Sequence, residues 1–191
     1  MKKHIALFAS GSGTNVQNIA EYFKDHDSIE VSVILSNKKD AYVLERAKNL
    51  GIPSVVFNRQ EFYESDRILK VLSEHKIDLI VLAGFLWLVP DNLLRAYSGR
   101  IINIHPALLP KYGGKGMYGE RVHQAVKDSG DTLSGISIHY VDEHYDEGQI
   151  IFQSTCEVTP DDTPDTIAHK VHKLEYEHYP EIIKKLLTAD L

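Results

Sequence analysis

Two polar side chains follow an apolar run where a β-strand is expected to end. Ile101 and Ile102 lead to Asn103 and His105, and Pro106 comes next. Residues i and i+2 of a strand share a face, so Asn103 and His105 point the same way. An amide N–H stabilises a developing oxyanion, and an imidazole exchanges a proton near neutral pH. The pair therefore predicts proton-transfer chemistry at the end of a strand.

A glycine-containing turn is the second candidate site. It reads Ser10-Gly11-Ser12-Gly13-Thr14-Asn15 and joins an expected strand at 4–9 to an expected helix at 14–25. Glycines let the backbone approach a ligand, and a helix N-terminus offers free N–H groups to an anion. We expect phosphate binding here; the alternative is a plain strand–helix turn.

This turn departs from the fingerprint of nicotinamide dehydrogenases. Val16 stands where the third glycine would fall, and Asn37 stands near the position of the acid that would hold a ribose. A non-catalytic nucleotide-binding module would use the turn alone. It would leave Asn103 and His105 unexplained.

Four carboxylates crowd the turn at 142–148, which by itself is typical of a solvated acidic loop. They are Asp142, Glu143, Asp146 and Glu147. A carboxylate beside His105 would hold the imidazole as the imidazolium and fix its orientation. The spacing alone does not say which of the four does this.

Ten histidines raise the question of a metal site. His169 and His172 lie three apart on an expected helix, with Glu175 and His178 further along. No H-E-x-x-H motif is present, and charged helix faces often carry histidine, so we predict no metal. Trp87 follows an apolar strand, where it either packs in the core or walls an apolar pocket.

The bulk properties favour one domain, residues 1–191, in a cytoplasmic protein. The chain is 43% hydrophobic and has a net charge of -6, with a pI near 5.9. This acidity disfavours nucleic acid and anionic membranes as partners. Cys156 is the only cysteine, so no intrachain disulfide forms, as suits a reducing compartment. No segment reaches the roughly 18 apolar residues of a membrane span.

Expected strands and helices alternate through the first 105 residues. Strands are predicted at 4–9, 29–35, 53–57, 79–83 and 100–104, and helices at 14–25, 41–50 and 61–75. Continuous apolar strands separated by helices indicate a mostly parallel α/β sheet with helices on both faces. A glycine-rich loop at 111–119, a helix at 120–128, strands at 134–141 and 149–158 and a helix from Pro164 to Leu187 follow. The last two strands are expected to be antiparallel.

Several segments together resemble the phosphoribosylglycinamide formyltransferases, a folate-dependent family with a Rossmann-like fold. They are Gly11-Ser12-Gly13-Thr14-Asn15, Ser36-Asn37-Lys38, Leu82-Ala83-Gly84-Phe85, Asn103 to Pro110, and His139-Tyr140-Val141 leading to Asp146-Glu147-Gly148. The resemblance implies formyl transfer from 10-formyltetrahydrofolate, as a co-substrate, to the amine of 5-phosphoribosylglycinamide in purine biosynthesis. It implies direct transfer through a tetrahedral intermediate, with no permanently bound cofactor.

The resemblance also assigns roles to residues. The implied catalytic residues are Asn103, His105 and Asp146, with Asp146 raising the pKa of His105. The ribonucleotide contacts are Gly11, Ser12, Gly13, Thr14, Asn15 and Glu175. The resemblance also implies that residues from about 1 to 100 form a phosphate-binding α/β half. Residues 101–191 form the catalytic and folate-binding half. The folate contacts are Leu86, Trp87, Leu88, Val89, Asn103, Val141, Glu143, His144 and Asp146, with Arg59 as the candidate folate-contacting arginine. The Gly113–Gly119 loop is longer than in the best-known bacterial pattern.

Two relatives with the same chemistry are weaker alternatives. Methionyl-tRNA formyltransferase would need a nucleic-acid-binding domain and a basic surface. A formyltetrahydrofolate hydrolase would carry an N-terminal regulatory domain. We therefore expect small-molecule substrates only. We also expect the protein to be a monomer or a homodimer.

Overall fold

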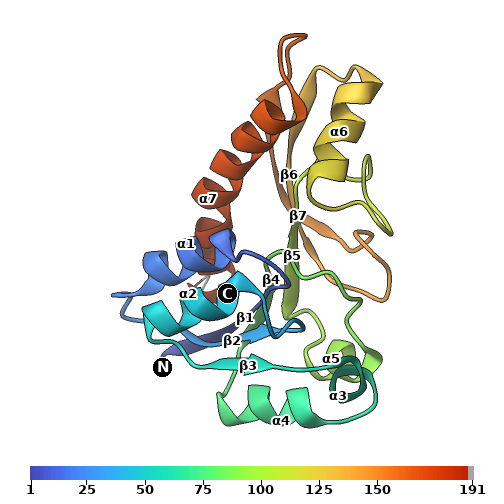
Figure 1. The fold of residues 1–191 in the computed structure, drawn as a ribbon. Helices are drawn as coiled ribbons and strands as arrows, with labels where there is room; N and C mark the ends of the chain where they lie inside the picture. Colours follow the sequence, from blue (N-terminus) through green and yellow to red (C-terminus); the bar gives the residue numbers. More distant parts are fainter. Residues whose placement is uncertain (189–191) are drawn as a thin grey trace.

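The computed structural model describes residues 1–188, which form a seven-stranded sheet with seven helices around it (Figure 1). The strands are β1 Lys3–Phe8, β2 Ile29–Ser36, β3 Ser54–Val56, β4 Leu79–Leu82, β5 Ile101–His105, β6 Leu133–Tyr140 and β7 Ile150–Glu157. The helices are α1 Thr14–Phe23, α2 Tyr42–Leu50, α3 Arg59–Tyr63, α4 Arg67–Glu74, α5 Asp91–Ala96, α6 Glu120–Ser129 and α7 Pro164–Thr188. Every predicted strand is present, with its ends shifted by at most one residue.

The strand order is β3-β2-β1-β4-β5-β6-β7. β3, β2, β1, β4 and β5 are parallel, and β6 and β7 join antiparallel beside β5. The fold class predicted from the sequence is therefore confirmed. The chain grows outward from β1 to β3 and then returns to β4 on the other side of β1. The carboxyl ends of β1 and β4 thus flank a topological switch point, where open α/β sheets bind ligands.

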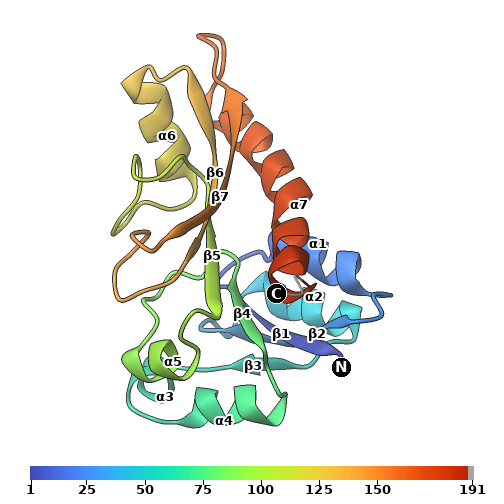
Figure 2. The ribbon, with the colours of Figure 1, turned by 180° about the vertical axis from the view of Figure 1, so that it is seen from behind.

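Both faces of the parallel part are buried, as the continuous apolar strands require. In β1, Ile5 and Leu7 pack under α1, α2 and α7, whereas Ala6 and Phe8 pack against α3, α4 and α5. The two helical layers lie on opposite sides of the sheet in both ribbon views (Figures 1 and 2). β6 and β7 extend away from this double-sided core, with α7 packed on them and α6 packed against α7 (Figure 2).

The helix predicted at 61–75 is wrong in its continuity, because two helices occupy that region. α3 begins early, at Arg59, since Asn58 and Glu61 form a capping box through hydrogen bonds of 2.9 Å and 2.8 Å. Ser65 then bonds the carbonyl of Glu61 instead of continuing the helix. A six-residue helix, α5, was not predicted, because its length shows little periodicity.

The remaining helices match their predictions, and α7 begins at Pro164 as expected. Tyr179 is wholly buried on α7 and donates a hydrogen bond of 2.8 Å to the carbonyl of Leu82. This bond joins α7 to the carboxyl end of β4. Within residues 1–188, no helix combines the length and the apolar content needed to cross a membrane.

Candidate active site

A cavity of about 900 Å³ opens at the switch point, over the carboxyl ends of β1, β4 and β5. Its wall is drawn from the turn after β1, the segment after β4, the end of β5, the glycine-rich loop before α6, the loop after β6, and the first half of α7. Most of the residues predicted to be functional line this one cavity.

Asn103, His105 and Asp146 come together in the cavity wall. Asn103 and His105 are two residues apart on β5 and point to the same side of the sheet. β6 pairs with this part of β5 in antiparallel register. Asp146, in a left-handed conformation (φ 57°), reaches them from the loop after β6. Its Oδ2 lies 3.5 Å from His105 Nδ1, and its Oδ1 lies 3.5 Å from Asn103 Nδ2. The carboxylate therefore faces both β5 side chains.

His139 is a fourth member of this group that we did not predict. It lies directly opposite Asn103 in the register of β5 and β6. Its Nδ1–H donates to the carbonyl of Tyr140 at 2.8 Å, and its Nε2 lies 3.2 Å from Asn103 Nδ2. His139 Nε2 also lies 3.5 Å from Asp146 Oδ1. The antiparallel register of β6 was the signal that could have found it.

The glycine-rich loop holds both His105 and Asp146. His105 Nε2–H donates to the carbonyl of Tyr112 at 2.7 Å, and the Gly114 N–H donates to Asp146 Oδ2 at 3.1 Å. A Cβ at Gly113 would come within 2.6 Å of Leu109 Cδ2 and 3.3 Å of Asp146 Cβ, so only glycine fits without displacement. This end of the loop thus positions the carboxylate and the imidazole together.

Burial and charge set the protonation of this group. The pKa of Asp146 lies below its ordinary value. Burial raises this pKa, but the hydrogen bond to His139, the charge of His105 and the Gly114 N–H together lower it by a larger amount. Asp146 is therefore an ionised carboxylate.

The pKa of His105 also lies below its ordinary value, because burial lowers it more than Asp146 and the Tyr112 carbonyl raise it. Asp146 raises the pKa of His105, as expected. The expectation that His105 is a permanently protonated imidazolium is wrong, because its net pKa is lowered. Since Nε2–H is held by Tyr112, Nδ1 of a neutral His105 is the nitrogen left to take up a proton. Asp146 faces that nitrogen and stabilises the resulting charge.

The turn after β1 is open to an anion. Gly13 is the N-cap of α1 in a left-handed conformation (φ 77°), and no side chain caps the helix. A Cβ at Gly13 would lie 2.4 Å from Val43 Cγ2, so the turn requires glycine. Arg46 holds the turn by donating to the Ser12 carbonyl at 2.7 Å, and Lys38 lines the same cavity. The free N–H groups and these two cations suit a phosphate.

Glu175 lies beside this turn, although it comes from α7. It is buried, with 5% of its surface exposed, and its Oε2 accepts from Asn15 Nδ2 at 3.1 Å. His172 Nδ1 lies 2.9 Å from the same oxygen, which raises the pKa of His172. His169 is exposed and does not line the cavity. Residues 1–188 contain no cluster of three His, Cys, Asp or Glu side chains able to hold a metal.

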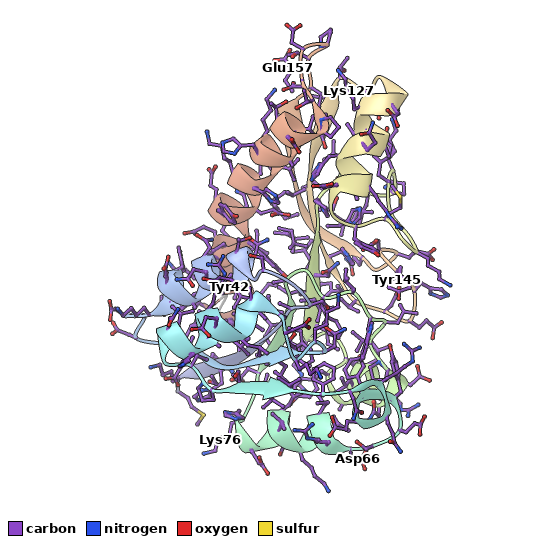
Figure 3. The ribbon with its side chains drawn as sticks, in the orientation of Figure 1. Tyr42, Asp66, Lys76, Lys127, Tyr145 and Glu157 are labelled. Atoms are coloured by element: carbon purple, nitrogen blue, oxygen red, sulfur yellow. The ribbon has the colours of Figure 1, made fainter. Side chains whose placement is uncertain are left out.

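The segment after β4 forms the apolar wall. Leu86, Trp87, Leu88 and Val89 all line the cavity. Ser10 Oγ accepts from the Leu86 N–H at 3.0 Å, and the Leu86 carbonyl accepts from the hydroxyl of Tyr145, labelled in Figure 3, at 3.4 Å. Trp87 both packs against Phe62 and Phe85 and faces the cavity, so the two alternatives for this residue combine.

Two residues predicted on the folate side lie outside the 900 Å³ cavity. Val141 and His144 line the 900 Å³ cavity, but Glu143 lines a neighbouring hollow of about 630 Å³ beside Leu88. The guanidinium of Arg59 is stacked 5.0 Å from the Tyr63 ring centre and 5.7 Å from that of Trp87, and it lines neither hollow. A folate contact by Glu143 or Arg59 therefore stays a prediction.

Comparison with known proteins identifies relatives along nearly the whole chain. A family described as formyl transferase matches residues 3–183. The chain is 42% identical over 188 residues to a chloroplastic phosphoribosylglycinamide formyltransferase of Arabidopsis thaliana, covering 95% of this chain and 64% of the plant protein. It is 40% identical over 190 residues to the Bacillus subtilis phosphoribosylglycinamide formyltransferase, covering 97% and 95%.

Solved structures give the same result. The phosphoribosylglycinamide formyltransferase of Streptococcus pneumoniae superposes with a TM-score of 0.85 at 43% identity, covering 98% of this chain and all of that one. The corresponding protein of Anaplasma phagocytophilum gives a TM-score of 0.90 at 31% identity, covering 99% and 88%.

Proposed function

Because the chain belongs to the formyl transferase family, we propose that it transfers the formyl group of 10-formyltetrahydrofolate to the amine of 5-phosphoribosylglycinamide, a step of purine biosynthesis. One observation carries the proposal: an amide, a neutral imidazole and an ionised carboxylate lie together in a cavity with an anion-binding turn at one side and an apolar wall at another. An anion-binding turn and an apolar wall in one cavity suit two substrates, one that carries a phosphate and one that carries a flat ring system. The names of the relatives support the choice of both.

The anion-binding turn supports the placement of the acceptor. The phosphate of 5-phosphoribosylglycinamide would take the free N–H groups at the start of α1, near Lys38. Glu175, beside the turn, is an acceptor for sugar hydroxyls. The amine at the other end of this substrate would then extend toward His105.

The apolar wall supports the placement of the donor. The flat ring system of a folate would lie along residues 86–89, in the cavity that Val141 and His144 also line. Its N10-formyl group would then lie close to Asn103, where the two substrates meet. Holding the reacting atoms in line supplies much of the rate acceleration.

The proposed reaction needs only these side chains. The acceptor amine attacks the formyl carbon, and the carbonyl oxygen becomes an oxyanion that Asn103 stabilises by donating an N–H. The positively charged attacking nitrogen gives a proton to Nδ1 of His105, and Asp146 stabilises the imidazolium that forms. That proton passes to N10 of the folate, the carbon–N10 bond breaks, and the carbonyl re-forms on the acceptor. The products are formylglycinamide ribonucleotide and tetrahydrofolate.

Formyl loss from 10-formyltetrahydrofolate tests the proposal when it is followed with and without 5-phosphoribosylglycinamide. We expect loss only when the acceptor is present, with one formylglycinamide ribonucleotide made per formyl group lost. Loss at the same rate without the acceptor would replace the proposal by hydrolysis. No loss under either condition would remove the folate donor. A cytoplasmic location and a monomer or homodimer remain predictions.

A further inference from the structure

Two buried polar atoms of the cavity wall have no hydrogen-bond partner within residues 1–188. They are Nδ1 of His123, on α6, and Oδ1 of Asn15, on α1. His123 is 3% exposed, and both residues line the 900 Å³ cavity. An unpaired polar atom in the interior destabilises the fold, so native proteins rarely keep one unless a ligand or water completes it. Both atoms therefore indicate that a polar group, from a ligand or a water molecule, completes the hydrogen bonds in this part of the cavity.

The neighbours of His123 place that ligand group. Its ring centre lies 6.3 Å from that of His172, whose Nδ1 is 2.9 Å from Glu175 Oε2. The same carboxylate oxygen accepts from Asn15 at the start of α1. His123 thus belongs to a cluster, His123–His172–Glu175–Asn15, that adjoins the anion-binding turn and shares the cavity with His105.

The charge of His123 decides what it can bind. Burial lowers its pKa, and the nearby His172 and His105 lower it further, against a smaller opposing effect of Glu175. A neutral imidazole has one N–H donor and one acceptor nitrogen. It therefore suits a hydroxyl or an amide, which can both donate and accept, better than a phosphate, which only accepts. The unpaired Oδ1 of Asn15 likewise needs a donor group, which a hydroxyl or an amide N–H supplies.

We propose that His123 determines acceptor specificity by hydrogen-bonding an uncharged polar group of the acceptor, a sugar hydroxyl or the glycinamide amide, between its phosphate and its reacting amine. This inference rests on the proposed function, because it takes the acceptor from there. It adds a contact from α6, an element for which no binding role was predicted. His123 would then discriminate against amines that lack such a group.

Kinetics of His123→Phe and His123→Gln test this, with His169→Phe as the matched control on an exposed histidine. Acceptor and donor concentrations are varied in turn, and thermal unfolding is followed for each protein. We expect His123→Phe to raise the KM for the acceptor by about tenfold or more, the effect of losing one good hydrogen bond in a buried site, with the donor KM unchanged. His123→Gln keeps a donor and an acceptor, so it should retain more of the affinity. His169→Phe should match the wild type.

The melting temperature separates binding from packing. If His123 is kept for a ligand, His123→Phe removes an unsatisfied buried atom and should unfold at the same or a higher temperature than the wild type. If His123 only fills space, phenylalanine should serve at least as well as glutamine in the kinetics. That order of the two variants would overturn the proposal, and so would an unchanged acceptor KM in His123→Phe.

An acceptor without its phosphate identifies the group that His123 contacts. We expect the defect of His123→Phe in kcat/KM to keep the same size with this acceptor. A defect that disappears would assign His123 to the phosphate and overturn the inference. The wild-type protein separates the two levels of the argument: absence of acceptor-dependent transfer by the wild type contradicts the proposed function, whereas transfer by the wild type with no effect at His123 contradicts only this inference.

Discussion

The carboxyl end of β5 and the loop at 141–149 bring side chains to the same point by different means. β5 lies between β4 and β6, so Asn103 is fixed by pairing with both neighbouring strands, and His105 is fixed by pairing with β6. Asp146 comes from a loop without regular structure and adopts a left-handed conformation. It is held by the Gly114 N–H and by the side chains that it faces. The strand therefore supplies reacting groups in a rigid frame, whereas the loop supplies a charge that other residues must position.

This difference predicts two kinds of defect. Changes on β5 should remove chemistry and leave the structure intact. Changes that affect Asp146 should alter the protonation or orientation of His105, with smaller losses of rate.

His105→Ala should have the largest effect, because it removes the group that moves the proton. We expect kcat to fall by about 10²–10⁴ with little change in either KM. The alanine leaves a cavity and an unpaired Tyr112 carbonyl, so the melting temperature should fall by several degrees while the protein stays folded. Steady-state kinetics and thermal unfolding check both points. A near-normal kcat would exclude His105 from the proton transfer.

Asn103→Ala should lower kcat by about 10²–10³, the usual loss for one oxyanion donor. The acceptor and donor KM values should change little, since the amide acts on charge that develops after binding. Asn103→Asp is the matched control for size, and it should be no more active, because a carboxylate cannot donate to an oxyanion. Activity in Asn103→Asp close to the wild type would contradict the assigned role.

Asp146→Asn should have a smaller effect on rate, about 10- to 100-fold, and a distinct effect on pH dependence. A neutral His105 acts as the base, so kcat/KM should fall as the pH drops through the pKa of His105, which lies below its ordinary value. Asp146 raises that pKa, so its removal should move the inflection to lower pH. An inflection that stays in place, or moves to higher pH, would show that Asp146 does not act on His105.

Gly113→Ala should have the smallest effect, a decrease in kcat of about tenfold or less. The added methyl group displaces the Leu109 side chain and shifts Asp146 by a few tenths of an ångström. Gly130→Ala, at the end of α6, is the control. A Cβ at Gly130 would meet no atom within 4 Å, but the backbone there is left-handed (φ 73°). Gly130→Ala should therefore cost about 1–2 kcal/mol of stability and no activity. Equal kinetics for both variants would mean that the loop does not position the carboxylate.

The strand side of this comparison could be predicted from the sequence. Runs such as 79–83 and 100–104 are apolar and short, and the alternation along a strand is enough to put Asn103 and His105 on one face. The anion-binding turn before α1 could also be predicted, because Gly13 adopts a backbone conformation that favours glycine, and a helix N-terminus attracts anions. Each of these signals is local in the chain.

The loop side could not be predicted from local signals. The choice of Asp146 among four carboxylates came only from the family resemblance, because the path of a loop depends on contacts far away in the chain. His139 was missed for a related reason, since only the register of β6 against β5 places it opposite Asn103. The net pKa of His105 depends on burial, which spacing does not show. His123 depends on how α6 packs against the cavity.

A double-mutant cycle of His105→Ala and Asp146→Asn tests most directly whether the carboxylate acts through the imidazole. The two single variants and the double variant are compared in formyl transfer under single-turnover conditions, so that product release does not mask the chemistry. If Asp146 works by stabilising the proton on His105, the double variant should be about as active as His105→Ala alone. Losses that multiply would show that the two residues act independently and would contradict the account of the site given above.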